Sequence, residues 1–274
     1  MSMKRWFLRW NCLLLALYFC VASVCAGEAE APPSPETRLS PECRESLDAA
    51  LARLREADVL NEEEAFDPEG VMLLSEAVIA ARRLMGSPEV ETRLPLNPDL
   101  PYYPALCWIY SQGWWGELGL EELDKAGMQK LKRDPQAAEA FCKRFEERTI
   151  RNAELVILLY KLECHRGGQK PPEIPETFPK EIPYKDVNWK APQNSKEADY
   201  LTPLRWAAYH NLVSGILDEA FEDAIYFHPI QEEIGKGTCL RGQFYAVLYR
   251  YELMIHPPET APAAQASAET APAA

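Results

Sequence analysis

Several patterns that mark common functional sites are missing from this sequence of 274 residues. No two cysteines have Cys-X-X-Cys spacing, so neither a zinc knuckle nor a thioredoxin-type redox centre is supported. No His-Glu-X-X-His motif occurs, and the glycines in the stretch 234–242 lack the Walker spacing of a nucleotide-binding loop. The acidic stretch 61–70 does not follow the ligand spacing of an EF-hand. The sequence therefore predicts no metal and no cofactor, and it contains no catalytic motif.

A long apolar run is also missing. The uncharged run from Cys12 to Ala26 has 15 residues, short of the roughly 20 that a membrane-spanning helix needs. It follows the basic residues Lys4, Arg5 and Arg9, and it ends in small residues before Gly27. This order is typical of a cleaved secretory signal peptide. We therefore interpret residues 1–26 as a signal peptide and expect the mature chain to be secreted or periplasmic and not membrane-spanning.

A lipid anchor at Cys25 is the alternative for this segment. The lipobox pattern has leucine three residues before the cysteine and a small residue just before it, whereas this chain has Ala22 and Val24. Cleavage is therefore the favoured interpretation. No Asn-X-Ser/Thr sequon occurs in the chain, which favours bacterial export over a eukaryotic secretory route.

Positive charge is scarce. Signal-peptide cleavage would remove three of the 29 basic residues and none of the 42 acidic ones, which leaves a net charge of −16. A surface of that sign repels nucleic acid and anionic membranes, because phosphate binding depends on clustered lysine and arginine. Nucleic-acid binding is therefore excluded.

Large apolar residues are absent after Ile255, where the chain repeats Glu-Thr-Ala-Pro-Ala-Ala. Such a segment cannot bury enough surface to offset its ordering entropy. We expect residues 257–274 to form a disordered Ala/Pro-rich tail and residues 27–39 a disordered linker. Five cysteines remain between them, an odd number that allows at most two disulfides. The pairing stays open among Cys43, Cys107, Cys142, Cys164 and Cys239.

Helical patterns account for most of residues 40–256. Four segments open with a capping residue followed by proline, a frequent helix start: Ser40-Pro41, Asp67-Pro68, Asp134-Pro135 and Thr202-Pro203. Their apolar residues recur at helical spacing, to about residues 57, 85, 166 and 227, and a last helix follows Thr238. No segment alternates as a strand does. We predict an all-α fold, an irregular multi-helix bundle or an array of helical hairpins.

Two parts of this domain are less regular. The pattern from 135 to 166 predicts either one helix of roughly 46 Å or two helices with a break near Thr149. Residues 167–202 contain six prolines, which exclude a regular helix, yet Ile174, Phe178 and Trp189 are too apolar for a free linker. We predict a Pro-rich strap laid over the helices, and a candidate lid or partner-binding edge. The capped starts at 67, 134 and 202 share nothing beyond the cap and proline, so they indicate no duplication.

The richest aromatic stretch is "PYYPALCWIYSQGWWG" at 101–116. Two prolines precede a predicted short helix at 105–112, which Gly113 ends. Large aromatic residues are usually mostly buried, which favours packing in the core. The alternative is a ligand platform, because two adjacent tryptophans after a glycine cannot share one helix face. The candidate ligand-binding residues are Tyr110, Trp114, Trp115 and, from the strap, Trp189.

These observations favour an exported binding module over an enzyme. The expected partner is an envelope or extracellular protein, or a glycan stacked on the aromatic residues. The alternative is a carboxylate-dependent hydrolase with a cleft beneath the Pro-rich strap, since the chain has many acidic residues. Carboxylates in a concave pocket beside exposed aromatic residues would favour that alternative.

Overall fold

The computed structural model describes residues 39–60, 66–193, 195–221, 224–229 and 237–258. The chain divides into two units, Met1–Arg38 and Leu39–Ala274. The first unit lies outside the described residues, and so do residues 259–274. The predicted signal peptide, almost all of the predicted linker and most of the predicted tail therefore fall outside the description.

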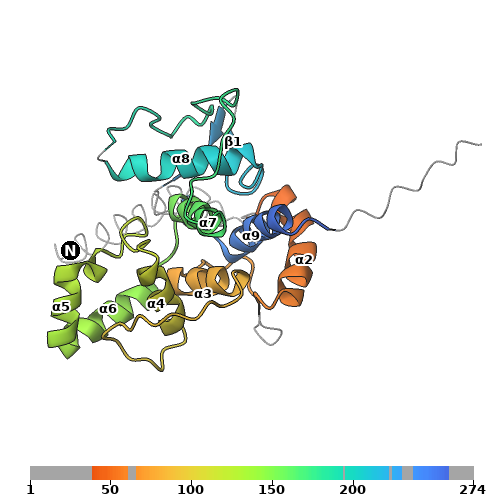
Figure 1. Cartoon of the computed structure of the whole chain (residues 1–274). Helices are drawn as coiled ribbons and strands as arrows, with labels where there is room; N and C mark the ends of the chain where they lie inside the picture. The colour runs from red at the N-terminus through yellow and green to blue at the C-terminus, as the bar shows by residue number, and fades with distance from the viewer. Residues whose placement is uncertain (1–38, 61–65, 194, 222–223, 230–236, 259–274) are drawn as a thin grey trace, which may run out of the picture. The chain divides into compact units, whose positions relative to one another are not determined.

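The second unit is mostly helical, which confirms the all-α prediction. Its elements are α2 (Pro41–Glu56), α3 (Leu74–Leu84), α4 (Tyr103–Ser111), η2 (Glu121–Leu123), α5 (Lys125–Arg133), α6 (Pro135–Glu147), α7 (Asn152–Arg166), α8 (Lys196–Tyr209), β1 (Glu219–Phe221), β2 (Ala224–Tyr226) and α9 (Arg241–Ile255). Helix α7 lies in the middle of these, in contact with α3, α8 and α9 (Figure 1). Within the described ranges, none of the helices has the length and apolarity to cross a membrane.

Two of the predicted helix starts are present. The Ser40 side chain accepts the amide of Cys43, and that of Asp134 accepts the amides of Gln136 and Ala137. In both cases proline follows at the first helical position, where a missing N–H costs nothing. The pattern at 135–166 forms two helices, with the break at 148–151.

The break exists because residues 149–151 take part in a junction of three short extended segments, together with 71–73 and 238–240. Their central amides form a closed ring: Met72 donates to Cys239 at 2.9 Å, Cys239 to Ile150 at 3.0 Å, and Ile150 to Met72 at 3.0 Å. Each pair of segments also makes one antiparallel bridge. The three central side chains are fully buried. The ring thus provides hydrogen-bond partners for buried backbone N–H and C=O groups that lie outside any regular sheet.

Each segment of this junction leads directly into a helix, α3, α7 or α9. The third residue of each helix is Glu or Gln, and its side chain accepts the backbone N–H of the residue before the helix. The pairs are Glu76 with Leu73 at 3.2 Å, Glu154 with Arg151 at 3.0 Å, and Gln243 with Leu240 at 3.0 Å. The same local structure therefore occurs three times, at positions different from the capped starts compared in the sequence.

Gln243 provides a test of the junction. Its side chain is buried, accepts the amide of Leu240 and donates to the carbonyl of Ile216 at 3.0 Å. We expect Gln243→Ala to lower the free energy of unfolding by about 1–3 kcal/mol for each buried group left unpaired. Chemical denaturation measures this loss. The control is Gln136→Ala at an exposed helix position, expected to change stability by less than about 0.5 kcal/mol. Equal effects at the two sites would contradict this account.

The junction also explains why the second predicted helix starts late. Asp67 caps a turn that closes at Gly70, not a helix. The backbone of 70–74 is committed to long-range partners: Leu74 donates to Arg148, and Gly70 accepts from Arg241. The start predicted at Asp67-Pro68 is therefore wrong, and α3 begins only at Leu74.

The predicted helix from Pro203 to Phe227 is also wrong. Helix α8 begins earlier, at Lys196, so that Pro203 lies inside it, and it ends at Tyr209. Asn211 follows with a φ of 54°, the left-handed conformation that commonly ends helices. The strands β1 and β2 then form a small antiparallel hairpin. Leu212 and Ile216, whose spacing favoured a continued helix, lie in compact turns after α8.

The Pro-rich strap ends at about residue 193, because residues 196–202 are the first turns of α8. It is attached to the rest of the unit by backbone and side-chain bonds. Asp186 accepts the amides of Phe227 at 2.9 Å and His228 at 2.6 Å. Tyr184 forms a parallel bridge with Ile225, next to strand β2. Arg205 of α8 donates to the carbonyls of Phe178 and Pro179, both at 2.8 Å.

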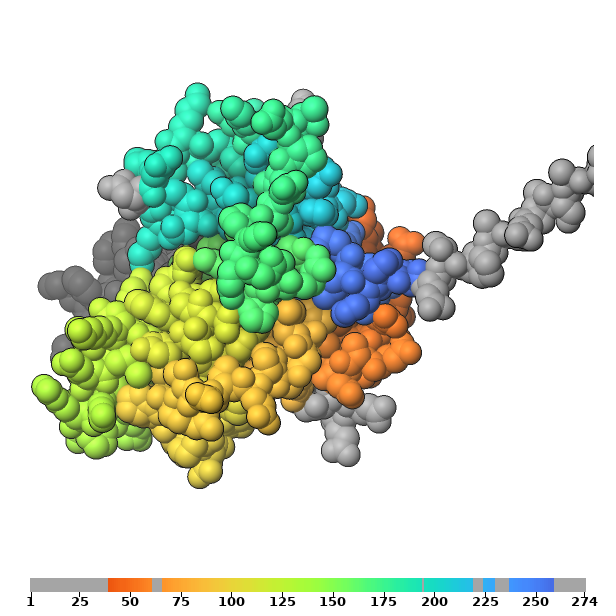
Figure 2. Space-filling model, in the orientation of Figure 1, coloured from red at the N-terminus to blue at the C-terminus, as the bar shows by residue number. Residues whose placement is uncertain are grey.

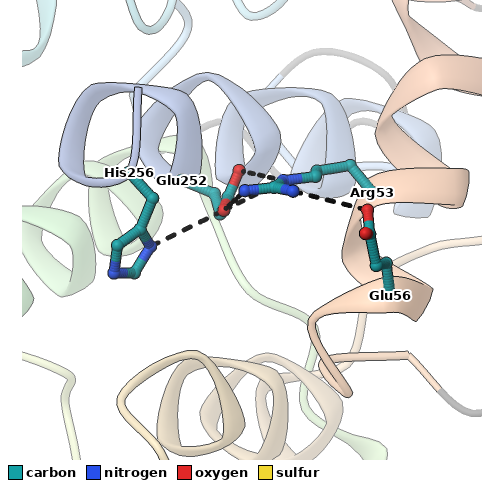
Figure 3. Close-up of polar contacts among 4 residues, drawn as sticks. All are labelled: Arg53, Glu56, Glu252 and His256. Carbon is teal, nitrogen blue, oxygen red and sulfur yellow. Dashed lines mark hydrogen bonds and ion pairs between the residues drawn. The ribbon is translucent and has the colours of Figure 1, made fainter. Parts of the chain in front are cut away.

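The two ends of the described unit pack together. Helix α2 packs against α9 (Figure 1), and in Figure 2 residues 39–60 (orange) and 237–258 (blue) lie next to each other at the surface. Arg53 of α2 reaches across to Glu252 of α9, with Nη2–Oε1 at 2.9 Å and Nε 3.1 Å from both carboxylate oxygens (Figure 3). The Glu252 side chain is only 2% exposed. His256 approaches the same carboxylate at 3.6 Å.

The five cysteines of the described residues are free thiols, so none of the disulfides that the cysteine count allowed is present there. All but Cys142 are buried. Burial raises the pKa of the Cys43 thiol to about 12. A thiol of that pKa is not a nucleophile at neutral pH, which agrees with a packing role.

Candidate functional site

The aromatic stretch is mainly part of the core. Trp114 is 3% exposed and packs edge-to-face on Trp108, with ring centroids 5.1 Å apart. His165, in the last turn of α7, lies against both indoles at about 6 Å. The imidazole is held by Gln112, whose Oε1 is 3.0 Å from Nδ1. Trp114 is therefore covered, and its ring faces are not open to a ligand.

The other three candidates are half-buried. Tyr110, Trp115 and Trp189 all pack against the core cluster while they retain some exposure. The indole N–H of Trp189 is buried and has no hydrogen-bond partner among the described residues. The structure does not gather these side chains around a common cavity, and none of them lines the two cavities considered next.

A first cavity lies where the strap leads into α8. It has a volume of about 450 Å³ and is lined by Glu117, Glu121, Arg148, Glu154, Lys196 and Glu197, among others. Three of these carboxylates have a basic partner: Glu121 binds Lys196 at 2.6 Å, Glu117 binds Lys161 at 2.6 Å, and Glu154 binds Arg148. The Lys196 hydrogen bond lowers the pKa of Glu121. That direction is opposite to the one a general acid needs at neutral pH.

A second cavity, which we call the arginine pocket, lies between the end of α2, helix α3 and the start of α9. Its volume is also about 450 Å³, within the usual size range of small-ligand sites. The apolar part of its lining consists of Val59, Leu60, Phe66, Ile79 and Ala80, with Pro101 at one side. The ring of Tyr245 adds to this surface and packs edge-to-face on Phe66 at 5.6 Å.

Three arginines and one glutamate supply the charge of the arginine pocket. Glu76 binds Arg241 through two hydrogen bonds, of 3.1 Å to Nε and 2.8 Å to Nη2. The hydrogen bonds to Glu76 raise the pKa of Arg241 above its ordinary value. The junction fixes the pair, because Arg241 is the first residue of α9 and Glu76 is the third of α3. The lining therefore carries a formal charge of +2 in a chain whose net charge is −13.

The other two arginines of the pocket have no carboxylate partner among the described residues. Arg83 of α3 donates only to the carbonyl of Val59, at 3.3 Å. Arg55, in the last turn of α2, has its Nε buried and without a hydrogen-bond partner in the described part of the chain. A buried guanidinium N–H without a partner is costly. Two arginines that line one cavity therefore have guanidinium N–H groups that are not used in hydrogen bonds to the described residues.

Sequence reasoning missed this pocket. Arg55 and Arg83 occupy the last turns of two helices, where a basic residue has a purely local explanation in the helix dipole. Arg241 was interpreted only as part of a glycine-containing loop. The sequence does show three arginines at the ends of apolar helical segments. That pattern does not indicate a common pocket, because the relative positions of the helices are not known from the sequence. Among the residues that the structure describes, no cluster of three or more His, Cys, Asp or Glu residues suits a metal ion.

Comparison with known proteins adds no relative. No protein-family model matches this chain, and neither a curated protein nor a solved structure matches it.

Proposed function

We propose that the chain is an exported binding module that recognises an anionic group on an envelope or extracellular protein or on a glycan. One observation carries this proposal: Arg55, Arg83 and Arg241 line one cavity, in which Glu76 is the single carboxylate among the described lining residues. Arginine is suited to carboxylate and phosphate groups, because its planar fork donates several N–H groups in fixed directions. The apolar residues beside the arginines lower the local polarity, which strengthens such an interaction.

The alternative, a carboxylate-dependent hydrolase, has less support. Three of the five carboxylates that line the cavity at the end of the strap, those of Glu117, Glu121 and Glu154, are ion-paired, and the pKa of Glu121 is lowered. The described lining of the arginine pocket has one carboxylate, already bonded to Arg241, whereas glycoside hydrolysis needs a pair. Binding is therefore the function that this geometry favours.

An array of ligands tests the proposal. The mature protein and the variant Arg55→Gln/Arg83→Gln are applied to neutral glycans, acidic glycans, and peptides with free or amidated C-termini. We expect the wild-type protein to retain only ligands that carry an anionic group, and the variant to lose them. The matched control is Arg44→Gln, an exposed arginine of α2 outside the pocket. Binding of neutral ligands only, or equal binding by the variant, would show that the proposal is wrong.

A further inference from the structure

We infer that the arginine pocket binds a carboxylate joined to an apolar side chain, as at the C-terminus of a protein that ends in a hydrophobic residue. This inference rests on the proposed function and specifies the ligand of the same pocket. It depends on three properties of the lining: which positive charges are free, which negative charge is present, and what covers the rest of the cavity.

The free positive charge belongs to Arg55 and Arg83. Arg241 is compensated by the bidentate contact with Glu76, with Nη2–Oε1 at 2.8 Å. The Nε of Arg55 is buried without a partner, and Arg83 uses one nitrogen on the carbonyl of Val59. One carboxylate has two oxygens, each of which accepts hydrogen bonds from a guanidinium. A carboxylate between Arg55 and Arg83 would satisfy the buried N–H and balance part of the charge.

The number of free donors argues against a phosphate. Glu76 and Arg241 balance each other, so the remaining positive charge of the lining attracts either anion and does not discriminate between them. A phosphate has more oxygens to satisfy than a carboxylate. Among the described lining residues, the free guanidinium donors are those of Arg55 and Arg83.

The remaining lining argues against an acidic sugar. Val59 is fully buried, Leu60 is 7% exposed and Ala80 is 2% exposed, so this side of the cavity is hydrocarbon. The hydroxyl groups of a sugar would lose hydration there without gaining a partner, at a cost of about 1–3 kcal/mol each. A hydrophobic side chain gains from the same surface. Capture of a C-terminal carboxylate is an established mode of peptide recognition.

Fluorescence polarisation with labelled hexapeptides tests this inference. The probe ends in leucine with a free carboxylate, and the same peptide with an amidated C-terminus is the comparison. We expect amidation to weaken binding by about tenfold or more, the effect of losing hydrogen bonds to a charged group. Arg55→Gln and Arg83→Gln are expected to weaken binding of the free acid to a similar extent. Arg44→Gln should leave it within about twofold.

N-acetylleucine distinguishes the two possible sources of the carboxylate, a chain end and a free acid. If N-acetylleucine binds and the hexapeptide binds more tightly, the pocket recognises a chain end; equal affinities indicate a free hydrophobic acid. Both results support the shared chemistry. Equal binding of acid and amide, or no effect of the Arg55 and Arg83 variants, would overturn it.

Sialyllactose distinguishes failure of this inference from failure of the proposed function. Binding of sialyllactose without the peptide would contradict the inference and retain the proposed function, whereas no binding of any acid would contradict both. The variant Glu62→Gln/Glu63→Gln/Glu64→Gln is measured in parallel, because these residues follow Leu60 in the sequence. If external acids bind only to this variant, the occupant of the pocket is the chain's own carboxylates, and the inference of an external ligand is wrong.

Discussion

Replacing Trp114 with alanine is expected to lower the free energy of unfolding by about 3–5 kcal/mol, the range for truncating a buried tryptophan. Trp114 is 3% exposed and packs edge-to-face on the fully buried Trp108. Truncation would leave a cavity that both Trp108 and His165 border, and it would remove one of the two indole contacts of His165. The loss is measured by chemical denaturation of the mature protein.

Trp115→Ala is the matched comparison, since the two residues are adjacent and chemically identical. Trp115 is only half-buried, so its truncation removes less apolar contact and should cost clearly less than that of Trp114. The difference in unfolding free energy between the two variants, rather than either value alone, tests whether Trp114 is packed in the core. Equal losses, or a larger loss at Trp115, would contradict the placement of the Trp114 indole in the core.

The second large effect is expected at the ion pair between α2 and α9 (Figure 3). Replacing Arg53 with methionine removes the guanidinium that contacts both oxygens of Glu252. The carboxylate is then left buried with only His256 nearby, at 3.6 Å. Breaking a buried pair from one side is strongly destabilising, because the remaining charge has lost its compensation. We expect the Tm to fall by several degrees at pH 7.

A double variant completes this test. Arg53→Met/Glu252→Met removes both charges and should recover most of the lost stability, since apolar pairs often replace buried ion pairs without loss. The control Glu56→Gln changes only an exposed partner of Arg53, 73% exposed, and should have little effect. An unchanged Tm in Arg53→Met, or a double variant as unstable as Arg53→Met, would show that the ion pair has no such role.

The sequence predicted helices best where their signals are local. Ser40 and Asp134 were identified as caps, and both cap helices, because the side-chain oxygen and the following proline act within one turn. Asp67-Pro68 has the same two residue types but begins a turn. The difference lies in the backbone of 70–74, whose long-range partners are residues 148, 150, 239 and 241. No local pattern reports a partner so far away in the sequence.

The three-way junction could not be predicted for the same reason. Its segments are three residues long, too short for the alternation that identifies a strand. The recurring signal is the Glu76, Glu154 or Gln243 side chain that accepts the amide preceding its helix. In the sequence this is only an acidic or amide residue four positions after an apolar one. Its meaning depends on Met72, Ile150 and Cys239 meeting in space.

The candidate site was predicted less well than the fold. Aromatic density was interpreted as a core or a platform, and Trp114 belongs to the core, while Tyr110, Trp115 and Trp189 stay half-buried. The arginine pocket has no sequence signature, because it is made where the ends of α2 and α3 meet the start of α9. Arg55 and Arg83 are 28 positions apart and become neighbours of one cavity only through packing.

Arginine footprinting tests the binding function most directly, because it needs no variant. The mature protein is treated with phenylglyoxal, with and without a saturating hexapeptide that ends in leucine with a free carboxylate, and modified arginines are located by mass spectrometry. The account predicts that the peptide slows modification of Arg55 and Arg83 and leaves the exposed Arg44 and Arg133 unchanged. Uniform slowing of all four arginines, or protection of Arg44 and Arg133 alone, would contradict binding in the arginine pocket.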